Sequence, residues 1–481
     1  MATTVLWFRR DLRLHDHPAL ARAVSDGDRI APLFVVDDAL VAGRARSANR
    51  LWFMRESVAQ LARSLDERGA PLFLLRGDPT EVVPAFAAWA GAKRVSVSRD
   101  YAPYGRLRDG RVEARLRSAG IGWAASPGLL ITEPEEVLTT DGTAFRVFGP
   151  FQRRWLEVAT RPILPAADRI DGITAHHVVA ALASVGPREG GTARSTLVFD
   201  GAQALLDGLP RVTPTADQAL LPAPGEHAAR DRLADWAESQ ALDRYGTDRD
   251  RLDLAGTSRL SQDLRWGLLS PIEVAASCAG PGEGHRRFRS ELAWRDFYAH
   301  RLWDEPRAVR ASSRPELEHV AWDRDPVVIN AWREGLTGYP IVDAAMSQLQ
   351  ACGWMPNRAR MIVAGFLTKH LGVDWRVGAR HFMEHLIDGD VASNAGGWQW
   401  AASTGTDPQP WFRVFSPTLQ GRRHDPDGTY IRRWVPELSG LRGNAVHEPP
   451  TGAYIRPIVE HATARQRALD RYRAAARSQL R

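Results

Sequence analysis

The sequence predicts an N-terminal α/β domain built on a doubly wound parallel sheet, followed by an all-helical domain. Three observations lead to this expectation. Short apolar runs alternate with helical stretches early in the chain, helical periodicity dominates from about residue 226, and 481 residues exceed what one hydrophobic core usually serves. The expected division is 1–130 for the α/β domain, 131–225 for a connector and 226–481 for the helical domain.

Four short apolar runs form the predicted sheet, and each has the length and composition of a buried parallel strand. They are 3–8, 29–37, 70–76 and 94–99. Between them, 50–68 and 80–90 carry helical patterns, and Gly69 ends the first of these helices. No Gly-x-Gly-x-x-Gly motif follows the first run, so a standard dinucleotide site in this domain is not supported. The connector holds most of the Pro, Gly, Thr and Ser clusters, including 186–195.

Composition excludes several classes of protein. The sequence has no apolar run long enough to span a membrane, and its N-terminus becomes charged too early for a signal peptide. Cys278 and Cys352 cannot build a disulfide framework and lack metal-type spacing, so a cytoplasmic protein without a metal site is expected. A monomer is the default expectation. Of the 63 basic side chains, 61 are arginine, which suits phosphate contact; the general richness in Ala, Arg and Gly explains most of them equally well.

The segment 255–271 places Thr257, Ser258 and Ser261 at the expected start of a helix. Hydroxyls and free backbone N–H groups collect there, and such a position accepts phosphate. A helix that is simply capped by these hydroxyls explains the same residues.

Two further segments combine polar and aromatic residues at helical spacing. In 291–298 a carboxylate, an indole and a guanidinium are predicted to share one helix face, and in 354–363 an amide and a thioether do the same. The residues concerned are Glu291, Trp294, Arg295 and Tyr298 in the first segment, and Asn357 and Met361 in the second, with Arg358 and Arg360 beside them. A solvated helix with a salt bridge is the alternative for either segment.

The segment 386–417 is the least ordinary in a chain that contains 17 tryptophans. Asp390, Asn394 and Trp398 stand four apart, so a helix would align a carboxylate, an amide and an indole. The adjacent Gly396 and Gly397 leave room for another group to approach closely. Buried polar groups need partners, and a bound aromatic ligand with polar edges would supply them.

These motifs resemble those of the DNA photolyase/cryptochrome family, and within it the class I enzymes that split cyclobutane pyrimidine dimers. The resemblance covers nearly the whole chain and rests on several long motifs in the same order. They are WFRRDLRLHDHPAL, GTSRLS, ELAWRDFY, TGYPIVDAAM and DGDVASNAGGWQWAASTGTD. It implies an α/β antenna domain, a connector and a helical FAD-binding domain, and a light-dependent DNA repair enzyme.

The resemblance also assigns cofactor residues. Tyr245 and the run 257–261 match contacts to the FAD phosphates and ribose, and Phe288 matches a further cofactor position. The run consists of Thr257, Ser258, Arg259, Leu260 and Ser261, and the remaining matching residues are Arg360, Asp388, Gly389, Asp390 and Asn394. Arg360 and Asp388 match an ion pair beside the flavin. Asp390 matches the residue that binds the flavin ring edge, and Asn394 matches the residue that faces the ring nitrogen that takes up a proton. Trp398, Trp375 and Trp322 match the chain that carries electrons to the flavin from the surface.

Substrate residues follow from the same resemblance. The positions that match the dimer pocket are Glu291, Trp294, Asn357, Arg358, Met361 and Trp400, with Arg295 and Tyr298 on the same helix. Arg249, Arg413 and Gln420 match DNA-contacting positions. Photolyases act on flipped-out bases, so flat walls from Trp294 and Trp400 and hydrogen bonds from Glu291 and Asn357 are expected, with Glu291 most effective when protonated.

Three alternatives were weighed against dimer repair. Plant-type cryptochromes, which signal without repairing, usually carry Asp at the position of Asn394 and lack the indoles at Trp294 and Trp400. Photolyases for (6-4) lesions use histidines at Asn357 and Met361. A nucleotide-binding α/β protein without photochemistry would be colourless. Pro356 departs from the usual histidine of the family, and proline is tolerated at the start of a helix.

A second, light-harvesting chromophore is also implied. The segment 99–109 resembles deazaflavin-type more than folate-type photolyases, because the Asn-Glu pair of the folate type would fall at Tyr104 and Gly105. Arg50, Asp100 and Arg265 match deazaflavin contacts. Ala102 replaces a more usual glutamate, which leaves another flavin or an empty site as alternatives.

Overall fold

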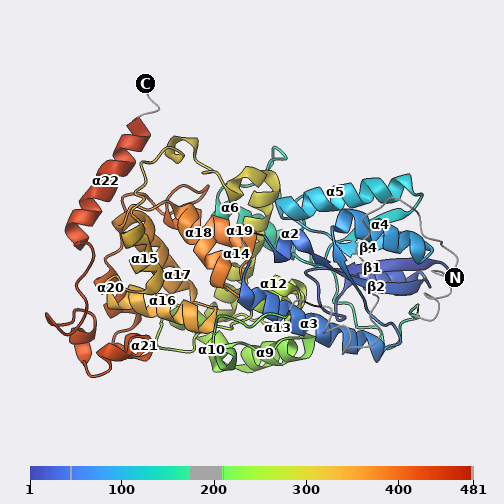
Figure 1. Ribbon diagram of the computed structural model, residues 1–481, viewed down its shortest axis with the longest axis horizontal. Coiled ribbons are helices and arrows are strands. Elements are labelled where there is room, and N and C mark those ends of the chain that lie inside the picture. Colours follow the sequence, from blue (N-terminus) through green and yellow to red (C-terminus); the bar gives the residue numbers. More distant parts are fainter. Residues whose placement is uncertain (44–45, 174–208, 210, 478–481) are drawn as a thin grey trace.

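The computed structural model describes residues 1–43, 46–173, 209 and 211–477, so the connector stretch 186–195 lies outside the described residues. Its N-terminal region contains a five-stranded, all-parallel sheet in the order β3-β2-β1-β4-β5 (Figure 1). The strands are β1 Thr3–Phe8, β2 Arg29–Asp37, β3 Phe73–Gly77, β4 Ala92–Ser98 and β5 Gly122–Ser126. The predicted fold class is confirmed.

Helices cover both faces of this sheet. On β1, Leu6 and Phe8 pack into one core with α1 and α3, whereas Val5 and Trp7 pack into another with α4 and α5. Successive strand residues point to opposite faces, which is why the apolar runs are continuous. The helices of this region are α1 Pro18–Ser25, α2 Asp38–Val41, α3 Ala48–Asp66, α4 Pro79–Trp89 and α5 Pro103–Ser118.

The fifth strand is the main difference from the sequence-based expectation. Its residues, GWAAS, lack an apolar run because β5 is an edge strand that is only partly buried. The third strand also begins later than expected, at Phe73, and the fourth begins earlier, at Ala92.

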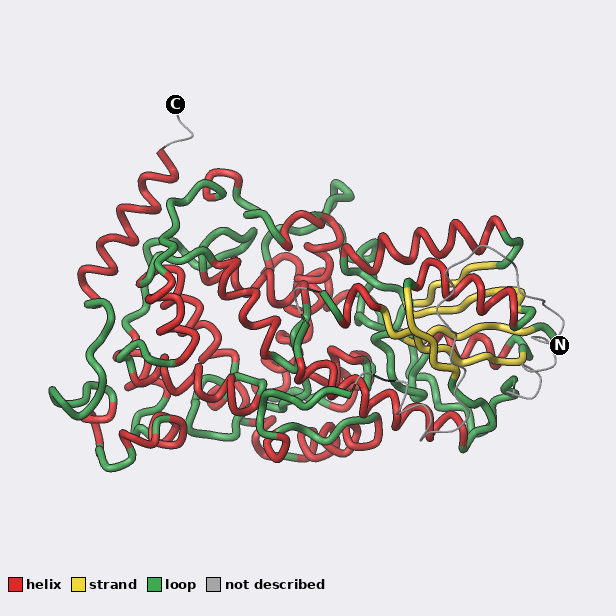
Figure 2. The backbone as a smooth tube through the Cα atoms, in the orientation of Figure 1, coloured by secondary structure: helices red, strands yellow, loops and turns green. Residues whose placement is uncertain are grey.

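The C-terminal region is helical, and within its described part β structure is limited to isolated bridges (Figure 2). One helix of the connector, α6 Phe148–Glu157, packs on α14. The helices that follow are α9 Glu226–Glu238, α10 Gln240–Asp243, α11 Tyr245–Asp248, α12 Ser261–Trp266, α13 Pro271–Ser277, α14 Glu283–Asp304, α15 Pro326–Glu334, α16 Pro340–Cys352, α17 Asn357–Gly365, the π-helical turn η4 Phe366–His370, α18 Trp375–His385, α19 Val391–Ala401, α20 Pro417–His424, α21 Thr429–Trp434 and α22 His461–Arg477.

Helix α19 is central to this region because it packs against α14, α17 and α18. These four helices carry many of the side chains singled out in the sequence, including Glu291, Asn357 and Asn394. Across the described residues, no helix is both long and apolar enough to cross a membrane.

Candidate functional site

The start of α19 is fixed by Asp390. This carboxylate is the N-cap of the helix, and its Oδ1 accepts hydrogen bonds from the backbone N–H groups of Ala392 and Ser393, each 3.0 Å long. One turn later, Asn394 donates from Nδ2 to the carbonyl of Ala379 on α18 at 3.0 Å. Trp398 packs against Gly378 of α18, where a side chain on residue 378 would collide with the indole. Asn394 and Trp398 therefore share a helix face, as their spacing predicts.

Arginines from distant parts of the chain surround Asp390. Arg10, just after β1, binds Asp390 with an Nη2–Oδ2 distance of 2.7 Å, and Arg265 donates from Nε to the carbonyl of Gly389 at 2.8 Å. Burial by itself would raise the pKa of Asp390, but Arg10, Arg265 and the N–H of Ser393 outweigh it and hold that pKa well below its usual range. Asp390 therefore stays charged at neutral pH.

The ion pair expected between α17 and the loop before α19 is present. Arg360 Nη2 lies 2.8 Å from Asp388 Oδ2, and Arg360 Nε donates to the carbonyl of Met355 at 2.7 Å. The other oxygen, Asp388 Oδ1, is buried and has no partner among the described residues; the same is true of Trp398 Nε1. Buried polar atoms without partners are costly, and this acceptor and this donor fit an aromatic ligand with polar edges, such as a flavin.

The hydroxyl-rich segment before α12 differs from the expectation in one respect. The helix begins at Ser261 with Leu260 at its N-cap, so Thr257 and Ser258 lie in the preceding loop and no side chain caps the helix. Both hydroxyl residues are half-buried, and Ser261 Oγ accepts from Trp354 Nε1 at 3.1 Å. Arg259 adopts a left-handed backbone with φ of 52° and lies over the ring of Trp354.

Tyr245 and Phe288 lie together although 43 positions separate them in the chain. Their ring centroids are 5.4 Å apart in an edge-on arrangement, and Trp236 of α9 completes the group at 5.6 Å from Phe288. Tyr245 and Phe288 are both buried. These rings form an aromatic wall of the helical region, and the sequence did not single out Trp236.

Two ion pairs connect the predicted DNA residues of α14 and α17. Glu291 pairs with Arg249, and Asp250 pairs with Arg358 at 2.6 Å. Because Arg249 and Asp250 are consecutive residues, this short segment connects α14 and α17 through its two ion pairs. The structure thus presents Glu291 as the partner of an arginine, which differs from the protonated acid that the sequence analysis favours.

Trp294 has one face already covered. Phe148 of α6 stacks on it with a centroid distance of 3.7 Å and an interplanar angle of 9°. Tyr298, one turn further along α14, fills the space that Gly396 of α19 leaves open. The close approach expected at Gly396 is therefore made by a tyrosine, whereas Gly397 faces no atom within 4 Å.

Tyr298, Gly396 and Trp400 line a hollow of about 430 Å³ that is partly open to solvent, together with the loop residue Asp407. Asp407 also accepts a hydrogen bond from the backbone N–H of Phe148 at 2.9 Å. The hollow thus lies between α14, α19 and the loop of Asp407, and Asp407 connects this loop to the start of α6.

Helix α17 begins at Asn357, with Pro356 at the N-cap position. Proline therefore sits where its missing N–H costs nothing. Asn357 is exposed, and its Nδ2 lies 3.7 Å from Met361 Sδ, which places the two side chains on one face as predicted. Arg413 is exposed in the loop before α20, and Gln420 lies half-buried on α20.

Arg295 and the predicted antenna residues lie where the α/β region meets the helical region. Arg295 donates to the carbonyls of Leu129 and Leu264, at 2.7 and 3.4 Å. Arg50 donates to the carbonyl of Leu386 at 3.0 Å, close to the Gly389 carbonyl bound by Arg265. Asp100 accepts from Arg108 at 3.3 Å and lies 3.8 Å from Arg10. These side chains thus tie the α/β region to the loop 386–390.

Of the three tryptophans expected to carry electrons, two are buried and one is half-buried. Trp398 and Trp375 are buried, and Trp322 is half-buried, with its ring 6.3 Å from that of Tyr472 on α22. Trp375 lies on α18 one turn before Gly378, on which Trp398 packs. Trp332 contacts Trp398 edge-on at 6.0 Å, and only the tertiary fold reveals this neighbour.

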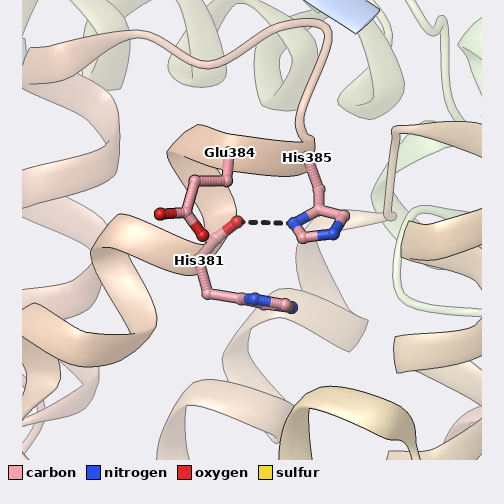
Figure 3. Close-up of side chains that lie close together, drawn as sticks. All are labelled: His381, Glu384 and His385. Carbon is pink, nitrogen blue, oxygen red and sulfur yellow. Dashed lines mark hydrogen bonds between the residues drawn. The ribbon is translucent and has the colours of Figure 1, made fainter. Parts of the chain in front are cut away.

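A group of potential metal ligands that the sequence analysis did not single out lies on α18. His381, Glu384 and His385 each place a ligand atom within 4.8 Å of the others. Figure 3 shows that Nδ1 of His385 is hydrogen-bonded to the carbonyl of His381, at 2.9 Å. A metal ion using that nitrogen would have to displace this bond.

Comparison with known proteins gives the same picture for both regions. The model of the family "DNA photolyase" matches residues 4–168, and that of the "FAD binding domain of DNA photolyase" matches residues 288–474. A deoxyribodipyrimidine photo-lyase from Streptomyces griseus is 38% identical over 483 residues, which cover 97% of this chain and 98% of the relative.

Solved structures agree with this similarity. A bacterial class III photolyase from Agrobacterium tumefaciens superimposes with a TM-score of 0.88 at 34% identity, covering 99% of this chain and 98% of that one. A Synechocystis cryptochrome reaches 0.84 at 28% identity, covering 98% and 99%. An archaeal photolyase from Sulfolobus tokodaii, described with two FAD molecules, reaches 0.82 at 28%, covering 98% and 100%. The chain belongs to the DNA photolyase family.

Proposed function

We propose that this protein repairs DNA in a light-dependent reaction, splitting cyclobutane pyrimidine dimers with FAD as its cofactor. One observation carries the proposal. Helix α19, which holds Asn394 and Trp398, packs on both α14 and α17, which carry the dimer-pocket residues Glu291 and Asn357. A cofactor beside Asn394 would therefore lie close to a lesion held by these two helices.

The residues that would hold FAD are those around the loop 386–390 and α12. Asp390, which also caps α19, would bind the ring edge of the flavin, and Asp388 with its unpartnered Oδ1 would lie beside the flavin as the partner of Arg360. Thr257, Ser258 and Ser261 supply hydroxyls to the phosphates. When bound in its fully reduced form, FAD would absorb the light, lend one electron to the dimer and take it back. The cyclobutane ring of the dimer would thus open without net redox change.

The residues of this chain bind and orient the lesion. The indoles Trp294 and Trp400 present flat apolar surfaces to a flipped-out dimer, and Asn357 offers an amide to its base edges. Arg249 leaves Glu291 when it binds a DNA phosphate, which frees the carboxyl group to hydrogen-bond the dimer. Trp398, Trp375 and Trp322 carry electrons inward from the surface.

A second chromophore belongs to the same proposal. A small hollow between the two regions, partly open to solvent, is lined by Arg10, Tyr101, Arg295 and Asp390, among others. The sequence favours a deazaflavin as this chromophore through Arg50, Asp100 and Arg265, and a relative described with two FAD molecules supports a second flavin-like group. Absorption and mass spectra of the chromophores released from the native protein identify it.

The test is repair under blue light of two oligonucleotides, one with a cyclobutane dimer and one with a (6-4) lesion. We expect repair of the first alone, because Asn357 and Met361 stand where (6-4) photolyases use histidines. Matched reactions in the dark provide the control. A cryptochrome would bind FAD and repair neither substrate, and this outcome would overturn the proposal.

A further inference from the structure

Lysine is nearly absent from this chain, and one of its two lysines is buried. Lys93 and Lys369 stand among 61 arginines, and Lys369 is only 1% exposed. Lys93, by contrast, has a half-exposed side chain that pairs with Asp28 at 3.2 Å. A buried ammonium is costly unless it is well partnered, and lysine, unlike arginine, gives up its proton readily in such a place.

The backbone around Lys369 is also unusual. Residues 366–370 form a π-helical turn between α17 and α18, and such turns are often found at functional sites. The turn directs Lys369 toward the loop before α20. It directs the next residue, His370, toward α22, where its Nε2 lies 2.9 Å from Nδ1 of His461.

The partners of Lys369 are two backbone carbonyls of a single short loop. Nζ donates to the carbonyl of Arg413 at 2.9 Å and to that of Pro410 at 3.5 Å. The same loop is closed by a hydrogen bond from Arg413 N–H to the Pro410 carbonyl, 2.9 Å long. No carboxylate of the described residues forms an ion pair with Lys369. The ammonium group thus binds the segment 410–413, which also carries the exposed Phe412.

We propose that Lys369 is a positioning residue that fixes the 410–413 loop for DNA binding, and that DNA holds the proton on Lys369. The inference rests on the proposed function, since it takes this loop as part of the DNA-binding face. Arg413 is the nearby cation that a DNA phosphate would neutralise. Once the charge of Arg413 is balanced by a phosphate, the protonated form of Lys369, which donates to the backbone of the same residue, becomes less costly.

The electrostatics of the free protein agree with this geometry. Burial, and then the charge of Arg413, lower the pKa of Lys369 from 10.5 to about 7. Burial likewise lowers the pKa of His370 to about 3, and that of His461 is also lowered, so these imidazoles add no positive charge at neutral pH. DNA should raise the pKa of Lys369. Affinity for DNA should then fall as pH rises from 7 to 9, about tenfold for each unit of that rise in pKa.

The holoprotein with isotope-labelled lysine allows a direct measurement, because only two lysine side-chain signals are present. We expect one signal to titrate near pH 7 and to shift upward when undamaged duplex DNA is added. The variant K93M should remove the other signal and leave the pH dependence of DNA binding unchanged. An Lys369 midpoint that is the same with and without DNA would overturn the proposal.

Binding measurements with K369M and K369R separate positioning from simple folding. K369M should bind DNA more weakly at pH 7 and lose the pH dependence, whereas K369R, if its longer side chain fits, should bind without pH dependence. FAD content reports whether each variant folds. DNA binding by K369M with the pH dependence intact would contradict the inference. Binding of DNA without repair of the dimer would instead contradict the proposed function alone.

Discussion

The cofactor side and the DNA side of α19 differ in how their carboxylates are neutralised. On the cofactor side, the Asp388 side chain is 3% exposed and bound to Arg360, and one of its oxygens has no partner in the described chain. On the DNA side, the side chains of Glu291 and Asp250 are 27% and 34% exposed. Their partners, Arg249 and Arg358, are themselves expected to contact DNA.

This difference teaches how one small region can serve two ligands. A buried charge must keep a fixed partner, so the cofactor side is organised before any ligand arrives. A half-exposed pair in water costs little to break, so a DNA phosphate can compete for the arginine. If the proposed function holds, the carboxylates on the DNA side would keep these arginines in place until DNA phosphates replace them.

The largest effect is expected where the cofactor side loses a cation. Replacing Arg360 with Met removes the hydrogen-bonded cation from the buried Asp388, which should lower the free energy of unfolding by about 3 kcal/mol and release FAD. Urea denaturation and flavin absorbance measure the two effects. The double variant R360M/D388N removes the stranded charge and should recover part of the stability. Equal stability of the single and double variants would remove the basis of the comparison.

An intermediate effect is expected for Trp294, the indole proposed to contact the lesion. W294A should weaken binding of dimer-containing DNA by about 5-fold to 150-fold, since a stacked base contributes about 1–3 kcal/mol, and it should leave FAD content nearly unchanged. F148L is the matched control because it removes the ring stacked on Trp294 but keeps the indole. If both variants bind damaged DNA as the parent does, Trp294 has no role in the lesion pocket.

The smallest effect is expected at an exposed phosphate contact. R413A should weaken the binding of damaged and undamaged DNA alike, by about a few-fold. It should also reduce the slope of log affinity against log salt concentration by about 1. R117A, which removes an exposed arginine of α5, should leave the slope unchanged. A loss of affinity for damaged DNA alone would place Arg413 in the lesion pocket and would contradict its role as a general phosphate contact.

Much of the architecture was predictable from local pattern. Strands β1 and β2 were found at the expected residues because both of their faces are buried, which makes their apolar runs continuous. The shared faces of Glu291 with Trp294 and of Asn394 with Trp398 followed from helical spacing alone. The edge strand β5 escaped notice because partial burial leaves it no such pattern.

Local pattern thus predicted the helical character of the second region, the faces shared by several polar and aromatic residues, and the resemblance to the family. Only the tertiary structure decided the partners, because ion pairs such as Arg10 with Asp390 join residues 380 positions apart and leave no periodic signal. The stacking of Phe148 on Trp294 and the burial of Lys369 against the 410–413 loop likewise depend on how helices pack. Spacing along a helix fixes which side chains share a face, but packing decides what that face meets.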